Sequence, residues 1–306
     1  MGHPITTFKK HYSEKYKTAI GKIALDAEVA CPNRKRGGCT FCAAASYTPF
    51  YLQKGDPIPT QLDKGKKYLA THGFQKYFAY FQQETTTAAA TSHLIPKFTH
   101  PLQDRDCVGL IISTRPDYVG DDLLEELVVL QHEFQKEVVI ELGLQSAHDH
   151  TLFELNRNHT VADFTDAVMR IKKCRCIEIG AHLILGLPGE SKQDIIATAQ
   201  MIASLDVDHV KLHHLQVIKD TPLHSLYIKN PFMVYGPRQY LALLAEILGY
   251  LQRRMVIHRL WSSTSSDLLV EPKWDTPYHE LQQILLDIMK EKSIRQGCYH
   301  MKTLTC

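Results

Sequence analysis

The sequence predicts an α/β protein: an open, partial (β/α)6 barrel of the TIM type with a C-terminal α/β extension. Two patterns predict this fold. Short runs rich in β-branched and aromatic residues indicate six strands, at residues 22–25, 76–82, 108–114, 138–144, 177–186 and 209–215. Helical patterns lie between most of them, at residues 62–71, 121–134, 161–173 and 192–205.

The spacing of these runs favours a parallel sheet. Successive strands are mostly separated by roughly 30 to 40 residues, the length of a βα unit with a right-handed crossover. A closed barrel of this type needs eight such units. Six would leave a lateral cleft in which a cofactor and a bulky substrate could meet.

Short sequence motifs predict where two helices begin, and a change of pattern predicts one domain boundary. Thr160 with Asp163 and Ser191 with Asp194 have the spacing of capping boxes, in which the hydroxyl satisfies a free backbone amide. After residue 216 the strand and helix alternation fades. We therefore expect residues 1–216 to form the barrel, and residues 217–306 to form an extension that closes the cleft. It has helices at 237–252 and 277–292 and a short strand-like piece at 255–260.

Composition predicts a soluble cytoplasmic protein that does not associate with membranes. Of the 306 residues 44% are hydrophobic and 22% charged, and no apolar run reaches the length of a membrane span. The first residues lack the apolar core of a signal peptide. The net charge is only +2, but residues 1–42 hold eight Lys or Arg against three Asp or Glu. This local excess permits a nucleic-acid partner, although the lysines at 9, 10, 15 and 17 also suit a solvated helix face.

Three cysteines near the start of the chain are the main functional signal. Cys31, Cys39 and Cys42 have the spacing C-x7-C-x2-C, and Gly37 and Gly38 allow the backbone to turn tightly between them. Ordinary cubane iron-sulfur clusters take four thiolates, so three would leave one iron open to a small molecule. We predict a [4Fe-4S] cluster whose open iron binds S-adenosylmethionine (SAM). A zinc site would need a fourth protein ligand, and no His or Cys lies nearby at finger-like spacing.

The other cysteines show no partner spacing. We expect them to be free thiols in a reducing compartment, namely Cys107, Cys174, Cys176, Cys298 and Cys306.

Several further motifs accompany the cysteine run over most of the chain. They are YFQ (80–82), STRPD (113–117), ELGLQS (141–146), NRNH (156–159), HLI (182–184), GLPGE (186–190), KLH (211–213) and IHR (257–259). Together with the cysteines they resemble the radical SAM superfamily. Within it they resemble the YhcC/YtqA-type branch, which is related to elongator-type catalytic subunits. The seven residues between Cys31 and Cys39 make a shorter loop than is usual in that branch.

The resemblance implies a chemistry and a set of SAM-binding residues. The reduced cluster would cleave SAM to a 5'-deoxyadenosyl radical, which takes a hydrogen atom from the substrate, and an electron donor such as flavodoxin or ferredoxin would reduce the cluster. Phe41 would lie against the adenine, although plain core packing also suits it. Arg157 would bind the methionine carboxylate if it is not a surface arginine. The remaining implied contacts are Gln82, Gln83 and Glu84 for the amino group, and the turn with Gly186, Pro188 and Gly189 for the adenine. The stretch at 82–84 lacks the glycines usual in the family, so an ordinary polar loop is the alternative there.

The strand at 138–144 is expected to direct polar groups into the cleft. Pleating places Glu141, Gly143 and Gln145 on one face. We expect Glu141 and Gln145 to contact the cofactor, with ribose hydroxyls or a structural ion pair satisfying the Glu141 carboxylate. His182, Lys211 and His213 on the next two strands are candidate catalytic groups, as proton donors or substrate contacts, and ordinary structural contacts are the alternative.

The resemblance also suggests a substrate. Modification of a tRNA base, with the wobble uridine as the candidate, is the leading hypothesis, because relatives of the elongator-like group act on tRNA. The alternatives are a radical SAM enzyme acting on a small metabolite or porphyrin, and a non-catalytic iron-sulfur protein for electron transfer or sensing. The last would require a fourth cluster ligand.

Overall fold

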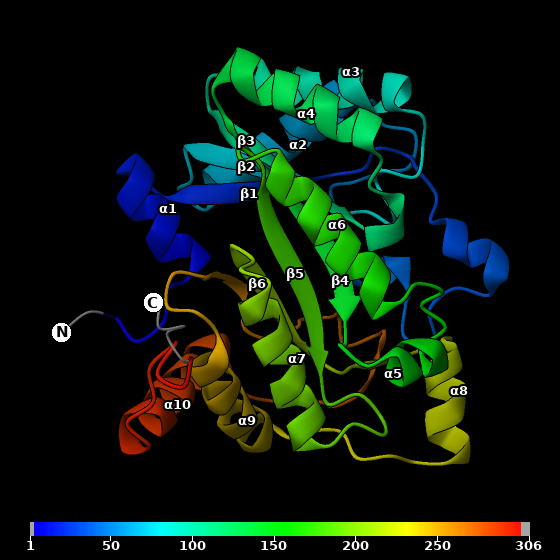
Figure 1. The fold of residues 1–306 in the computed structure, drawn as a ribbon, viewed down its shortest axis with the longest axis vertical. Coiled ribbons are helices and arrows are strands. Elements are labelled where there is room, and N and C mark those ends of the chain that lie inside the picture. The colour runs from blue at the N-terminus through cyan, green and yellow to red at the C-terminus, as the bar shows by residue number, and fades with distance from the viewer. Residues whose placement is uncertain (1–2, 301–306) are drawn as a thin grey trace.

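A seven-stranded parallel sheet forms the core of the computed structural model, which describes residues 3–300. The strand order is β1-β2-β3-β4-β5-β6-β8. Their bounds are Ile20–Leu25 (β1), Lys76–Phe81 (β2), Cys107–Thr114 (β3), Glu137–Gln145 (β4), Glu178–Leu185 (β5), His209–His214 (β6) and Val256–Arg259 (β8). The sheet curls and carries helices on its outer side (Figure 1). The predicted partial barrel is confirmed.

The strand-like piece expected at 255–260 proves to be a member of this sheet. As β8, it pairs in parallel with β6 and adds a seventh strand to the six predicted ones. The two short strands that remain, Val217–Ile218 (β7) and Leu269–Glu271 (β9), form a separate antiparallel pair. The division of the chain at residue 216 stays a prediction.

Ten α-helices lie in the described range 3–300. Their bounds are Phe8–Tyr16 (α1), Ile58–Thr71 (α2), Thr91–Leu102 (α3), Asp121–Phe134 (α4), Asp149–Glu154 (α5), Val161–Lys173 (α6), Lys192–Ser204 (α7), Pro222–Lys229 (α8), Pro237–Tyr250 (α9) and Tyr278–Glu291 (α10). Short 3-10 turns lie at Pro32–Arg36 (η1), Ala44–Ser46 (η2) and Pro116–Tyr118 (η3). Both predicted capping boxes form, at Thr160 and Ser191. Helix α3 was not predicted, because Pro96 and Pro101 lie inside it. Within residues 3–300, no helix combines the length and apolar character needed to cross a bilayer.

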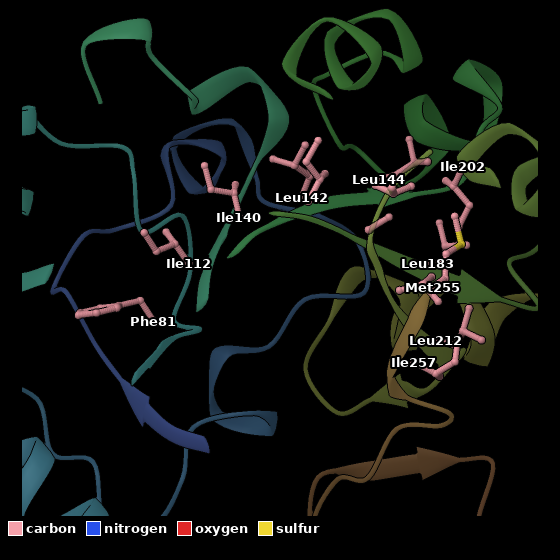
Figure 2. Packing of buried hydrophobic residues seen from close by; sticks show 14 of the residues in the cluster. Phe81, Ile112, Ile140, Leu142, Leu144, Leu183, Ile202, Leu212, Met255 and Ile257 are labelled. Carbon is pink, nitrogen blue, oxygen red and sulfur yellow. The ribbon is translucent and has the colours of Figure 1, made fainter. Parts of the chain in front are cut away.

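The outer face of the sheet makes the main core. Side chains from alternate strand positions pack against the surrounding helices, as Figure 2 shows for Leu142, Leu144 and Leu183 of the strands and Ile202 of α7. Most strand residues on the inner face are buried as well. Burial on both faces requires apolar side chains at successive positions, and the strands are accordingly nearly continuous apolar runs. This explains why the strands were visible in the sequence.

Helix α1 closes the amino-terminal end of the barrel. Phe8 and Tyr12 pack against inner residues near the starts of several strands, in a cluster that includes Phe78 and Val256. The backbone amide of Ile257 in β8 donates to the carbonyl of Thr6 at 2.8 Å, and α1 contacts both edge strands, β1 and β8. We call Phe8, Tyr12 and their inner-face partners the aromatic plug. It leaves the carboxyl-terminal end of the barrel free for a site.

Replacing Tyr12 by alanine should destabilise the fold. Tyr12 is fully buried, so Tyr12→Ala removes a large side chain and leaves a cavity, which costs about 3 kcal/mol or more of unfolding free energy. Glu14→Ala on the exposed side of the same helix should cost less than about 0.5 kcal/mol. Urea denaturation followed by circular dichroism measures both. Equal losses for the two variants would contradict the proposed plug.

Candidate active site

A cavity of about 1080 Å³ lies inside the barrel and brings most of the predicted site residues together. The predicted residues that line it are Cys31, Cys39, Phe41, Cys42, Gln82, Glu84, Gln145, Arg157, His182, Lys211 and His213. Glu141 and Gln83 are buried next to this lining rather than part of it. The turn with Gly186, Pro188 and Gly189 is likewise not part of the lining.

The cysteines lie on a tight loop that follows β1. Cys31 precedes the 3-10 turn η1, and the chain then passes through Gly37 and Gly38, whose φ angles are +90° and +73°. These left-handed conformations favour glycine, as the sequence indicated. Cys39 is buried, whereas Cys31 and Cys42 are half-buried. All three side chains therefore border the same cavity from one short loop.

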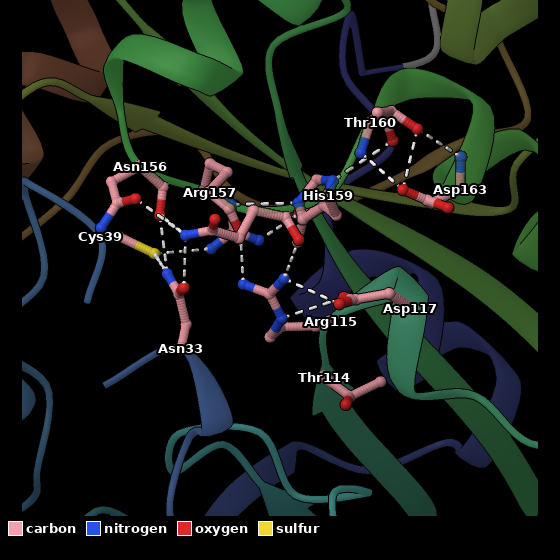
Figure 3. Close-up of polar contacts among 12 residues, drawn as sticks. Asn33, Cys39, Thr114, Arg115, Asp117, Asn156, Arg157, His159, Thr160 and Asp163 are labelled. Carbon is pink, nitrogen blue, oxygen red and sulfur yellow. Dashed lines mark hydrogen bonds and ion pairs between the residues drawn. The ribbon is translucent and has the colours of Figure 1, made fainter. Parts of the chain in front are cut away.

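Two side chains donate hydrogen bonds to the sulfur of Cys39. Asn33 Nδ2 and Arg157 Nη1 each lie 3.3 Å from Cys39 Sγ (Figure 3). The loop is also tied to the chain after α5, since Asn156 Nδ2 donates to the carbonyl of Gly38 at 2.7 Å and Asn158 Nδ2 donates to Asn33 Oδ1 at 2.7 Å. Such donors stabilise a thiolate, which is the form that binds iron.

Arg157 also links this loop to β4. Its Nη2 donates to the carbonyl of Gly143 at 2.6 Å, and its Nε donates to His159 Nε2 at 3.1 Å. Burial and the neighbouring Arg157 guanidinium lower the pKa of His159 to about 3, so the ring is neutral and can accept this hydrogen bond. Arg115 Nη1 donates a hydrogen bond to the backbone carbonyl of Arg157 at 2.6 Å and so fixes the Arg157 backbone. The Arg115 guanidinium also forms an ion pair with Asp117 (Figure 3).

Glu84 anchors the first cysteine. Its carboxylate accepts from the Cys31 backbone amide at 2.6 Å and from Arg34 Nε at 2.8 Å. Burial acts to raise the pKa of Glu84, but the hydrogen bonds from Arg34 and Cys31 outweigh it and hold the pKa below its ordinary value. The carboxylate is therefore charged at neutral pH. Its expected contact with the amino group of SAM stays a prediction.

The arrangement of the three thiols fits a cubane cluster better than a zinc ion. In the described residues 3–300, no three His, Cys, Asp or Glu side chains converge closely enough to hold one metal ion. A cubane binds its thiolates through separate corner irons and so does not require them to meet at one point. The Arg34 and Arg157 guanidinium groups, which border the same cavity, suit the negative charge of a thiolate-bound cluster.

Glu141 lies at the centre of a buried polar group on the inner face of the barrel. It is 1% exposed and accepts hydrogen bonds from Tyr80 (2.7 Å) and His182 (2.7 Å) at Oε2 and from His258 (2.7 Å) at Oε1. Lys211 Nζ lies 3.8 Å from Oε2. Burial acts to raise the Glu141 pKa, but Lys211 and His182 keep it well below its usual range. The structural ion pair considered from the sequence is present; a ribose contact of Glu141 is not tested.

Sequence reasoning missed several residues of this site. Asn33 and Arg115 belonged to motifs that carried the family resemblance, but no local signal gave them a role. Lys22, Tyr80 and His258 reach the cavity because their inward positions alternate with outward apolar ones, a signal present in the strand pattern.

Two family models match the chain. The model of the radical SAM superfamily matches residues 29–202, and the model of the Radical_SAM C-terminal domain matches residues 207–291. The chain belongs to the radical SAM superfamily. It is therefore an enzyme of a class that uses a [4Fe-4S] cluster and SAM. Cys31, Cys39 and Cys42 all border the cavity, and their role as the cluster ligands stays a prediction.

Similar proteins indicate which members of the superfamily this chain resembles. It is 31% identical to YtqA of Bacillus subtilis over 301 residues, covering 97% of this chain and 92% of that protein. It is 30% identical to YhcC of Escherichia coli over 274 residues, covering 88% of this chain and 87% of that protein. A more distant relative, a tRNA uridine(34) acetyltransferase of Methanocaldococcus infernus, is 24% identical over 195 residues, 63% of this chain and 35% of that protein.

A solved structure shares the fold. The archaeal Elp3 of Methanocaldococcus infernus superposes with a TM-score of 0.70 at 18% identity. The match covers 90% of this chain but only 64% of that one. It thus supports the barrel architecture and spans only part of the longer protein.

Replacing a cluster cysteine should abolish cluster binding. After anaerobic reconstitution, Cys39→Ser is expected to lose most of its iron and sulfide, because one of three thiolate ligands is gone. Cys298→Ser, which changes an exposed cysteine outside the loop, should keep the full content. Iron and sulfide analysis with electron paramagnetic resonance measures both. Full iron content in Cys39→Ser would exclude that residue as a ligand.

Proposed function

We propose that this radical SAM enzyme modifies a tRNA base, with the wobble uridine as the target. Two lines of argument support a nucleic-acid substrate. Its distant relatives include a protein named tRNA uridine(34) acetyltransferase and proteins named Elongator complex protein 3. The cavity mouth of this chain also carries groups that suit a nucleotide.

Exposed aromatic rings flank the mouth of the cavity. Phe50 is 81% exposed and lies 5.4 Å from the ring of Tyr68, measured between centroids, and both residues border the cavity together with Tyr51. Aromatic rings in such positions stack on bases and contribute about 1–3 kcal/mol per base. Arg34, Lys35 and Arg36 on the cluster loop are exposed and offer positive charge for a phosphate backbone. We call Phe50, Tyr51 and Tyr68 the mouth aromatics.

The chain's own residues would position the reactants. When bound, the cluster and SAM supply the 5'-deoxyadenosyl radical, and a donor such as flavodoxin or ferredoxin supplies the electron. Phe41 on the cysteine loop and Arg157 beside that loop border the cavity, where they would hold the adenine and the methionine carboxylate of SAM. The other proposed SAM contacts are Gln82, Gln83, Glu84, Glu141, Gln145, Gly186, Pro188 and Gly189. His182, Lys211 and His213 line the cavity further inside and would contact the substrate or donate a proton to it.

Reductive cleavage of SAM is the first measurement. The anaerobically reconstituted protein, given dithionite and SAM, should form 5'-deoxyadenosine, and Cys42→Ser should form none. Chromatography with mass detection quantifies the product. A protein that holds a full cluster but forms no 5'-deoxyadenosine would favour the non-catalytic electron carrier or sensor.

The tRNA target is tested by nucleoside mass spectrometry of tRNA from a strain that lacks the gene. A modified wobble uridine should be lost and should return with the intact gene. Phe50→Ala should restore it at a rate lower by about tenfold, as expected for one lost stacking contact. Phe153→Ala, which removes a ring that is 79% exposed on α5 away from the cavity, should restore it fully. An unchanged nucleoside profile would instead favour a small metabolite or porphyrin.

A further inference from the structure

Three cationic side chains meet on the inner floor of the cavity. Lys22 of β1, Lys211 of β6 and Arg259 of β8 all line it. Lys211 is paired in register with Arg259 across the two neighbouring strands, and the curl of the sheet brings β1 close to β8, since Lys22 Nζ lies 3.0 Å from His258 Nδ1. We call Lys22, Lys211 and Arg259 the floor cations.

One carboxylate faces these cations, and its hydrogen-bonding capacity is largely used. Both oxygens of Glu141 already accept from Tyr80, His182 and His258, at 2.7 Å each. Lys211 is the nearest floor cation and lies 3.8 Å away. Within the described part of the chain, the Arg259 guanidinium makes no hydrogen bond or ion pair, although five N–H donors are available on it.

This charge surplus is costly in a cavity walled by protein. A cation removed from water is destabilised unless an anion pairs with it. The lysines show the effect. Burial, only partly offset by Glu141, and the charge of Arg259 lower the pKa of Lys22 to about 8 and that of Lys211 to about 7. An anion bound on the floor would oppose both shifts, because it favours the charged form of each lysine.

We propose that Lys22, Lys211 and Arg259 form a receptor for an anionic group of the substrate, a carboxylate or a phosphate. The planar fork of Arg259 suits bidentate binding of either group, and the two lysines add point charges. Lys22 and Lys211 lie in the middle of β1 and β6, and Arg259, the last residue of β8, is in register with Lys211. The receptor therefore lies deeper in the barrel than the cysteine loop, which follows the end of β1. A substrate held there by its anionic end directs the rest of its structure towards the cluster. This assignment goes beyond the tRNA hypothesis and holds for a nucleotide or a small acid.

Sulfate is a suitable probe, because it resembles phosphate and does not titrate near neutral pH. Isothermal titration calorimetry uses the reconstituted protein with an oxidised cluster and saturating SAM, so that the cofactor site is filled and no turnover occurs. We expect one saturable site for sulfate. Acetate is titrated in a parallel experiment. Tighter binding of sulfate than of acetate indicates a substrate with a phosphate, and tighter binding of acetate indicates a substrate with a carboxylate.

Matched arginine variants locate the site. Arg259→Gln should weaken binding of the tighter anion at least tenfold, about 1.4 kcal/mol. Arg105→Gln makes the same charge change at a side chain that is 94% exposed and outside the cavity, and should leave the affinity unchanged. Iron content and circular dichroism verify assembly. If Arg259→Gln fails to fold, Arg259→Lys keeps the charge but loses the fork and should bind with intermediate affinity.

Proton uptake gives a second readout that surface binding would not produce. The pKa values of Lys211, about 7, and Lys22, about 8, lie near pH 8, and a bound anion should raise both, so binding should take up protons. The other titratable groups that face the floor do not change charge near pH 8, because burial is the main influence on each of them. It lowers the pKa of His182 to about 4 and those of His213 and His258 well below their usual value. It raises the pKa of Tyr80 well above its usual value. Glu141 stays ionised. Buffers with different ionisation enthalpies measure the uptake.

Three results would overturn the receptor. They are the absence of saturable binding for both anions, equal weakening by Arg105→Gln and Arg259→Gln, and binding without proton uptake at pH 8. None of these readouts depends on tRNA. Loss of the tRNA hypothesis through an unchanged nucleoside profile would leave the receptor standing, and the reverse also holds.

Discussion

The hydrogen bonds of Arg157 are the constraint on which the site depends. One guanidinium donates to the sulfur of Cys39 and to the carbonyl of Gly143, and so fixes the cysteine loop after β1 against β4, on the far side of the cavity. Arg115 holds the Arg157 backbone, and neutral His159 accepts its third donor. A loop rich in glycine and arginine has little intrinsic order. Its geometry therefore comes from this buried support rather than from the cysteines themselves.

The barrel interior is layered from one end to the other, and each layer follows from the side-chain alternation of the strands. The aromatic plug excludes water at the amino ends of the strands. Above it, Glu141 joins Tyr80, His182 and His258 from three other strands into one buried polar layer. The thiols follow at the carboxyl ends, where ligands of α/β folds are usually bound. The polar layer thus lies between an apolar base and the cysteine loop, and electrostatic interactions in this buried layer are weakly screened.

The parts of the structure that local sequence determines were predictable. Strands buried on both faces gave apolar runs, and Thr160 and Ser191 marked helix starts. The cysteine spacing pointed to a loop that does border the cavity. The features that could not be predicted are contacts between residues that are distant in the sequence. The contact of Asn33 with Asn158 and that of Lys22 with His258 depend on how the sheet curls, which no window of neighbouring residues encodes. Helix α3 was missed for a different reason, because tertiary packing of Leu94 and Phe98 outweighs the cost of its two prolines.

The two ends of the cavity together restrict the substrate. The mouth aromatics offer flat apolar faces, whereas the floor cations offer positive charge, and both groups border the same cavity. The plug packs the amino end of the barrel, and the cysteine loop follows the carboxyl end of β1. A molecule with a planar ring and an anionic group, as a nucleotide has, would satisfy both ends at once. A neutral metabolite would leave the Arg259 guanidinium without an anionic partner, so the proposed receptor favours an anionic substrate.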